Sequence, residues 1–270
     1  MPGIPEELRR ESLPLCGRTA LVTGASRRAG IGHAVARRLA AHGASVHLHH
    51  HVPPDSAMPW GADRTEDVVA SVREALGDPR ARVVAGPGDL ADPAEPARLV
   101  DTVAGEFGGL DILVANHALS GSDGTLDSID AAMLDAHWAV DTRSVLLLVQ
   151  AYARQAKPGG RVVLMTSGQD QGGGMPGEIA YALQKGALAS VTRSLATTLA
   201  ERGITVNAVN PGPVDTGYAT GEVHVAVAAR FPAGRWGRPD DPARLIAWLA
   251  TDEARWVTGQ VVNSEGDFRR

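Results

Sequence analysis

The sequence lacks the features that identify several large classes of protein. Its 270 residues include one cysteine, Cys16, so no internal disulfide can form and a cysteine-rich zinc module is excluded. No run of 18 apolar residues is present, which argues against a membrane-spanning helix. Residues 1–11 are charged and contain no apolar stretch typical of a secretion signal. These absences predict a soluble, cytoplasmic protein.

The chain also lacks a strong excess of charge of either sign. It has 26 lysines and arginines against 31 aspartates and glutamates, a formal net charge of −5. Nucleic-acid-binding proteins generally carry clustered basic residues, so neither a nucleic-acid partner nor a membrane partner is expected. The 44% of hydrophobic residues is sufficient for a large core in a chain of this length.

Short β-branched segments alternate along the chain with longer alanine-rich segments. The predicted strands cover residues 19–23, 45–48, 82–85, 111–115, 161–165, 205–209 and 260–262. The predicted helices cover residues 33–41, 65–76, 93–107, 131–156, 179–201 and 242–249. This order indicates repeated βαβ units. It predicts an α/β fold of the Rossmann type, with a doubly wound, mainly parallel seven-stranded sheet and helices on both faces.

Two stretches interrupt the alternation, residues 49–64 and 213–238. Both lie where a strand connects to a helix, at the edge where sheets of this kind bind ligands. No linker, repeat or low-complexity tract divides the chain. We therefore expect an N-terminal extension over residues 1–16 and a single domain over residues 17–270, with a substrate lid at about residues 213–238.

A glycine-rich loop follows the first predicted strand and precedes an alanine-rich helix. Glycines permit a tight turn and let backbone N–H groups approach a diphosphate at the positive end of the helix. The loop therefore predicts dinucleotide binding, although a simple βα turn uses glycine as well. The candidate cofactor contacts in it are Gly24, Ser26, Arg27, Arg28, Gly30, Ile31 and Gly32.

Tyr181 and Lys185 lie four residues apart at the start of the predicted helix over residues 179–201. They share one helix face, so the ammonium can lower the pKa of the phenol from its usual value of about 10. Ser167 follows the predicted strand over residues 161–165, where a hydroxyl can donate to a substrate carbonyl. Each feature has a plain alternative, a half-buried tyrosine or a serine that caps a turn. Their position after the fifth strand favours a catalytic site.

With these motifs in this order, the sequence resembles the short-chain dehydrogenase/reductase family from about Gly17 to Gly266, with 3-oxoacyl-carrier-protein reductase-like members nearest in motif style. The resemblance implies that Tyr181 exchanges a proton with the substrate oxygen and that Ser167 orients this oxygen. Lys185 would bind the nicotinamide ribose and lower the pKa of Tyr181.

Asp141 aligns with a family asparagine that holds a relay water. An anion there opposes the lowering of the Tyr181 pKa, and Asp141 is expected to pair with Lys185 or Arg143.

The same resemblance assigns further cofactor contacts. Asp89 and Leu90 correspond to the adenine site after the third strand. The family's turn after the fourth strand corresponds to Asn116, His117 and Ala118. Its Pro-Gly motif after the sixth strand corresponds to Pro211, Gly212, Val214 and Thr216.

The second predicted strand is followed by His49, His50 and His51 and carries no carboxylate that would repel a 2′-phosphate. Arg27 and Arg28 in the neighbouring loop suit a phosphate dianion. NADP(H) is therefore the favoured cofactor, with NAD(H) as the alternative, and His50 and His51 are counted among its contacts. No metal is expected, because successive strand residues point to opposite faces.

The predicted function is NADP(H)-dependent reduction of a ketone, or oxidation of the secondary alcohol, by serine–tyrosine–lysine chemistry. The substrate is a small molecule such as a cyclic ketone, a polyketide intermediate or an oxoacyl group on a carrier protein. The alternative is a low-turnover NADP-binding protein with a regulatory or structural role, suggested by the departures from the family pattern in the glycine-rich loop, at Ala118 and at Asp141. The resemblance implies a homotetramer or a homodimer.

Overall fold

The computed structural model describes residues 11–56, 58, 60–119, 121, 123–169, 171 and 174–269. Residues 1–10 of the predicted N-terminal extension lie outside the described residues. No helix within these ranges has the length and hydropathy needed to cross a membrane.

Seven parallel strands form one sheet in the described part of the chain, in the order β3-β2-β1-β4-β5-β6-β7. The strands are β1 (Thr19–Val22), β2 (Ser45–His50), β3 (Val83–Pro87), β4 (Ile112–Ala115), β5 (Arg161–Met165), β6 (Thr205–Asn210) and β7 (Val261–Asn263). The order reverses between β1 and β4, which is the point where such sheets bind ligands. The predicted fold class is confirmed, and the sheet is parallel throughout.

Helices connect the strands. They are α1 (Ile31–Ala41), α2 (Val52–Ser56), α3 (Thr65–Arg73), α4 (Glu95–Phe107), α5 (Ala131–His137), the π-helix η2 (Trp138–Arg143), α6 (Ser144–Gln155), α7 (Ile179–Ala200), α8 (Gly221–Ala228), α9 (Asp240–Leu249) and the 3-10 turn η3 (Asp252–Ala254). The predicted helix over residues 131–156 is thus divided by a π-helical turn. Two helices that the sequence did not predict, α2 and α8, lie within the two interrupting stretches.

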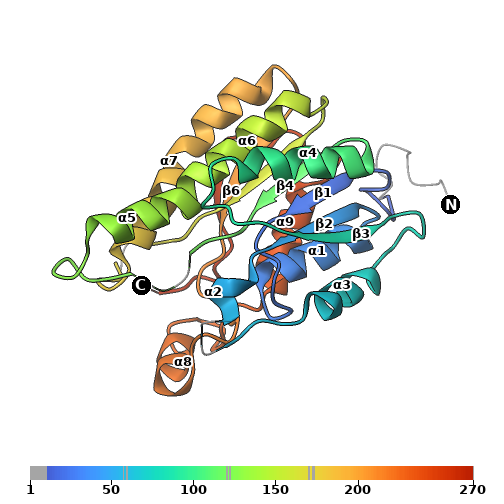
Figure 1. Cartoon of the computed structure of the whole chain (residues 1–270). Helices are drawn as coiled ribbons and strands as arrows, with labels where there is room; N and C mark the ends of the chain where they lie inside the picture. Colours follow the sequence, from blue (N-terminus) through green and yellow to red (C-terminus); the bar gives the residue numbers. More distant parts are fainter. Residues whose placement is uncertain are drawn as a thin grey trace.

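Each face of the sheet carries its own helical layer (Figure 1). Ala20 and Val22 of β1 pack with α1, α3 and α9, whereas Leu21 packs with α4, α6 and α7. This alternation follows from the two-residue period of a strand. All three side chains are fully buried, and burial of a leucine side chain contributes roughly 1.5–3 kcal/mol. The two buried clusters cover both faces of the sheet and position the strand ends from which the loops at its carboxyl edge begin.

Candidate active site

The glycine-rich loop after β1 is held by the turn after β4. The Asn116 amide donates from Nδ2 to the carbonyl oxygens of Thr23 and Gly24, at 3.0 Å each. A Cβ at Gly32 would lie 2.7 Å from Asn116 Nδ2, and a Cβ at Gly24 would lie 2.7 Å from the His117 Cα. Gly24 also has a φ of +66°, which favours glycine. The loop therefore packs too closely for side chains at these two positions.

Two buried histidines, His49 and His117, contact this loop. His117 Nδ1 lies 2.7 Å from Thr23 Oγ1, and its Nε2 lies 2.7 Å from Ser144 Oγ. Burial lowers the pKa of His117 well below its usual value, and His49 and Lys185 lower it further. Burial also lowers the pKa of His49 to about 4. Both rings are neutral at pH 7, and the His117 side chain joins β1, β4 and α6.

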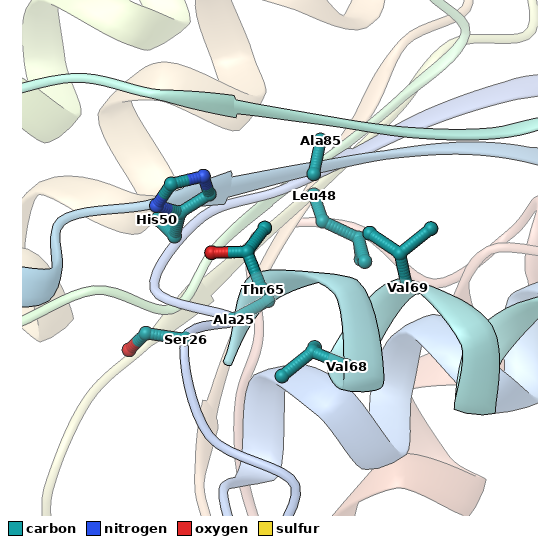
Figure 2. Close-up of a pocket in the computed structure, with 8 residues that line it drawn as sticks. All are labelled: Ala25, Ser26, Leu48, His50, Thr65, Val68, Val69 and Ala85. Atoms are coloured by element: carbon teal, nitrogen blue, oxygen red, sulfur yellow. The ribbon is translucent and has the colours of Figure 1, made fainter. Parts of the chain in front are cut away.

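A small pocket lies between the loop, the ends of β2 and β3, and the start of α3 (Figure 2). It is lined by Ala25, Ser26, Leu48, His50, Thr65, Val68, Val69 and Ala85. Leu48 and His50 line this pocket, whereas His49 points to the other face, where its Nε2 lies 3.0 Å from the Gly88 carbonyl oxygen. Among the described residues, no cluster of three or more His, Cys, Asp or Glu side chains could hold a metal ion.

Both arginines of the loop have partners. The Arg28 guanidinium donates to Asp63 Oδ1 at 3.2 and 3.3 Å, and its backbone N–H donates to Asp63 Oδ2 at 2.7 Å. Arg27 donates to the Thr216 carbonyl oxygen at 2.9 Å and lies over the Trp60 ring. Sequence reasoning missed Asp63, because it lies in a stretch without periodicity. Its carboxylate binds the glycine-rich loop through Arg28.

The residues predicted for the adenine site form a compact turn after β3. Asp89 Oδ1 accepts the Ala91 N–H at 2.9 Å and lies 4.0 Å from His51 Nε2. Leu90 is buried. The side chains of Asp89 and His51 therefore lie close together, while His50 lines the pocket on the other side of β2.

Tyr181 and Lys185 lie on the first two turns of α7, and Ser167 lies just after β5, whose carboxyl end faces the same edge. The Lys185 ammonium is buried, lies 5.4 Å from the centre of the Tyr181 ring and donates to the Met165 carbonyl oxygen at 2.9 Å. Tyr181 and Ser167 are half-buried. The structure thus brings the three predicted side chains to one edge of the sheet.

The electrostatics of this cluster differ from the expected lowering of the Tyr181 pKa. Burial raises the pKa of the Tyr181 phenol, and the Asp141 carboxylate raises it further. Burial lowers the pKa of Lys185, against the effect of Asp141. In the described part of the chain, no hydrogen bond joins the ammonium to the phenol oxygen; the ammonium donates to Met165. Tyr181 is therefore protonated at neutral pH in this structure.

Asp141 does not pair with Lys185 or Arg143, so the expected ion pairs are wrong. Its Oδ2 lies 2.8 Å from His137 Nδ1, and its Oδ1 accepts the Leu119 N–H at 2.6 Å. The Arg143 guanidinium donates to the Ala91 carbonyl oxygen. His137 is four residues before Asp141, one turn earlier on the same face. That spacing is visible in the sequence and could have identified the partner.

Asp123, which sequence reasoning missed, caps the helix that carries Tyr181. Its carboxylate accepts the N–H groups of Ala180 at 3.0 Å, Tyr181 at 2.8 Å and Gly124 at 2.7 Å. Burial opposes ionisation, but these three donors together lower the pKa of Asp123. The cap comes from the loop after β4, 57 and 58 residues earlier in the chain, so the first turn of α7 is fixed by a distant segment.

We expect Asp123→Ala to destabilise the protein by about 1–2 kcal/mol, as loss of a helix cap does, and to lower kcat by loosening the backbone at Tyr181. Denaturant unfolding and steady-state kinetics measure the two effects. The matched control is Asp130→Ala, because Asp130 caps α5 by accepting the Met133 N–H at 2.8 Å. The control should lose stability and retain kcat. Equal losses of kcat in both variants would contradict a positioning effect of Asp123.

The segment after β6 begins at the same carboxyl edge of the sheet. Gly212 has a φ of +62°, and its N–H donates to Asn210 Oδ1 at 3.0 Å. Val214 is buried and forms an isolated parallel bridge with Gly237. Beyond it, the rings of Tyr218 and Trp236 meet edge to face. This places α8, which has no buried residues, outside the carboxyl edge of the sheet (Figure 1).

An open hollow of about 300 Å³ lies beside the first turn of α7. Its lining is mainly apolar and consists of Gln169, Gly174, Met175, Pro176, Ile179 and Ala182. Tyr218 lies close enough to Tyr181 to affect the pKa of its phenol. Gly172 and Gly173 of the predicted loop lie outside the described residues. The described residues that line the hollow include Ile179 and Ala182 of α7 and do not include Tyr181, Ser167 or Lys185.

The parallel sheet, with a glycine-rich loop at its carboxyl edge, is typical of dinucleotide-binding oxidoreductases. The family model described as enoyl-(acyl-carrier-protein) reductase matches residues 24–266, and the chain belongs to the short-chain dehydrogenase/reductase family, whose members act on CH–OH and C=O groups.

Individual relatives resemble nearly the whole chain. The uncharacterized oxidoreductase YjdA of Bacillus subtilis is 42% identical over 93% of this chain and 96% of its own. The cis-4-hydroxycyclohexanecarboxylate dehydrogenase of Sinomonas cyclohexanicum is 36% identical over the same shares, 93% and 96%. A short-chain dehydrogenase structure from Burkholderia cenocepacia in complex with NADP is 40% identical, with a TM-score of 0.83, and the match covers 94% of this chain and 98% of that one.

Proposed function

We propose that this protein is an NADP(H)-dependent oxidoreductase that reduces a cyclic ketone or oxidises the corresponding secondary alcohol. The observation that carries the proposal is the placement of Tyr181, Lys185 and Ser167 at one carboxyl edge of the sheet. A phenol, an ammonium and a hydroxyl in this arrangement suit proton transfer to a carbonyl oxygen.

The residues at the glycine-rich loop fit a dinucleotide. Gly24 and Gly32 leave no room for a Cβ because it would meet the turn after β4 or the loop itself. Close packing therefore fixes the loop whose backbone would face a diphosphate. The pocket in Figure 2 lies beside this loop, with Ser26, His50 and Thr65 as its polar lining. These groups would border the adenosine ribose, and the arginines of the loop would meet the 2′-phosphate. When bound, the nicotinamide supplies or accepts the hydride.

The side chains of the chain itself handle the proton and the developing charge. Burial keeps the Tyr181 phenol protonated at neutral pH, so it can donate its proton to the carbonyl oxygen of a ketone. The Ser167 hydroxyl would donate a hydrogen bond to the same oxygen. The Lys185 ammonium would hold the nicotinamide ribose and stabilise the phenolate that Tyr181 becomes. A phenol that is already protonated favours reduction at neutral pH.

Two observations favour a ring-shaped substrate. The hollow beside α7 has an apolar lining that includes Met175, Pro176 and Ile179, and the Tyr218 ring lies near Tyr181. One relative at 36% identity is a dehydrogenase of cis-4-hydroxycyclohexanecarboxylate, a cyclic secondary alcohol. A single-domain organisation with a substrate lid over residues 213–238, a cytoplasmic location and a homotetramer or homodimer stay predictions.

The test is turnover of a panel of cyclic and open-chain ketones with NADPH and with NADH, followed by loss of cofactor absorbance. We expect cyclic ketones to be reduced and NADPH to be preferred. No turnover of any ketone, or of any secondary alcohol in reverse, would favour the low-turnover binding protein instead. A preference for NADH would overturn the cofactor assignment alone.

The ion pair between Arg28 and Asp63 yields a prediction about cofactor choice. Asp63→Asn keeps an acceptor for the Arg28 backbone N–H and removes the charge that competes for its guanidinium. An exposed ion pair contributes roughly 0.2–1 kcal/mol, so we expect kcat/KM with NADPH to rise by up to about fivefold, with no change for NADH. Arg28→Ala is the control and should lower the preference for NADPH. Equal gains with both cofactors would contradict a role of Arg28 at the 2′-phosphate.

A further inference from the structure

His137 and Asp141 form a fully buried pair beside the catalytic cluster. The two side chains are 1% and 0% exposed, with 2.8 Å between His137 Nδ1 and Asp141 Oδ2. The second carboxylate oxygen accepts the Leu119 N–H at 2.6 Å. The resemblance to the family assigns an uncharged asparagine to the position of Asp141.

Titratable groups near the pair come from two other segments. Lys185 and Tyr181 of α7 both interact electrostatically with Asp141. Asp123, from the loop after β4, interacts with His137. Two carboxylates therefore act on the imidazole. Asp141 contacts it directly, and Asp123 interacts with it electrostatically. Burial disfavours a positive charge on the ring, whereas the two neighbouring carboxylates favour it.

A buried carboxylate without a compensating charge would work against the proposed chemistry. It costs several kcal/mol of desolvation, and its field would cancel that of the Lys185 ammonium at the Tyr181 phenol. A neutral imidazole would accept or donate a hydrogen bond but leave this negative charge in place. A protonated imidazole removes it, because the pair then has no net charge.

We propose that His137 is a positioning residue that is protonated at neutral pH and forms a buried ion pair with Asp141, so that Asp141 opposes the charge of Lys185 less than an unpaired carboxylate would. The inference deepens the proposed function, on which its catalytic consequence rests. The pair itself needs no substrate and no cofactor, so its protonation can be measured separately from turnover.

The direct test is nitrogen-15 NMR of the histidine side chains in the full-length protein, with the His137 signals assigned by their loss in His137→Gln. We expect both His137 ring nitrogens to be protonated at pH 7. In Asp141→Asn, the ring is expected to be neutral at the same pH. A neutral His137 ring in the unaltered protein, or an unchanged protonated ring in Asp141→Asn, would overturn the proposal even if the protein turns over ketones.

The catalytic consequence is tested with a double-mutant cycle. Glutamine keeps a hydrogen-bond donor but cannot carry the proton, so His137→Gln leaves Asp141 as an uncompensated anion. We expect alcohol oxidation at pH 7 to fall by about tenfold for each unit by which the Tyr181 pKa rises, with a rise of about 1–2 units. In the Asp141→Asn background, His137→Gln should have no comparable effect. Equal losses in both backgrounds would show a packing effect and contradict the proposal.

If His137→Gln does not fold, His137→Asn provides the NMR assignment, and the comparison of the unaltered protein with Asp141→Asn decides the question. A failure of the proposed function would appear differently. It would leave the NMR result for His137 intact and show no turnover with any ketone or alcohol. The two inferences can therefore be rejected independently.

Discussion

Tyr181→Phe is expected to lower kcat for ketone reduction by about 10²–10⁴-fold, the usual contribution of a general acid. The substitution removes one oxygen atom and keeps the ring that packs near the Lys185 ammonium. The Kd of NADPH, measured by fluorescence titration, should change by less than about twofold, or about 0.4 kcal/mol, because the ring and the Lys185 ammonium are both retained. A loss of kcat with intact cofactor binding would identify the phenol as the proton donor.

The matched control for this substitution is Tyr152→Phe. Tyr152 is fully buried, and its hydroxyl donates to the Asp111 carbonyl oxygen at 2.7 Å. Burial raises the pKa of its phenol, as it does at Tyr181. Asp111 immediately precedes β4, so this phenol lies at the opposite edge of the sheet. The control should lose about 1 kcal/mol of stability and keep its kcat. An equal fall of kcat in the control would contradict the assignment of Tyr181.

The pH dependence of the reaction follows from the protonation of Tyr181. Because its pKa is raised, the phenol is protonated throughout the neutral range, and reduction should be independent of pH there. Reduction should fall only as the pH rises through the pKa of the bound state. Alcohol oxidation requires the phenolate and should increase with pH. Rate profiles in both directions, with and without Tyr181→Phe, measure these slopes.

The sequence predicted the strands and most helices, because buried parallel strands are short apolar runs bounded by glycine and aspartate. The predicted strand over residues 161–165 agrees with β5, Arg161–Met165, at both ends. The π-helical turn Trp138–Arg143 was not predicted, because a single wide turn hardly disturbs a helical pattern of apolar residues. The irregular composition of residues 49–64 and 213–238 likewise concealed α2 and α8.

The candidate site was predictable where its residues follow a local pattern. Tyr181 and Lys185 share a helix face, and that spacing is visible in the sequence. Asp123 and Asp63 could not be found in this way, because their partners are 57 or 58 and 35 residues distant in the chain. Their roles arise only when the loops come together at the carboxyl edge. His137 is an intermediate case. Its four-residue spacing from Asp141 is visible in the sequence, but its burial depends on packing against segments that are distant in the chain.

Gly32→Ala separates the helix propensity of a residue from the close packing of the glycine-rich loop. Gly32 is the second residue of α1, where propensity alone predicts that alanine stabilises the helix by roughly 0.5–1 kcal/mol. The structure predicts the opposite, because a Cβ at Gly32 would lie 2.7 Å from both Asn116 Nδ2 and the Gly24 carbonyl oxygen. The Asn116 amide would have to move, and it holds Thr23 and Gly24 through two hydrogen bonds.

We therefore expect Gly32→Ala to destabilise the protein by about 1–3 kcal/mol, as overpacking does, and to raise the Kd of NADPH at least about tenfold, or 1.4 kcal/mol. The control is Gly105→Ala in α4, where a Cβ meets nothing within 4 Å. Propensity acts alone there, so the control should gain stability and bind NADPH normally. Urea unfolding and fluorescence titration measure both quantities. Unchanged NADPH binding in a destabilised Gly32→Ala protein would mean that the loop supports the fold and does not hold the diphosphate.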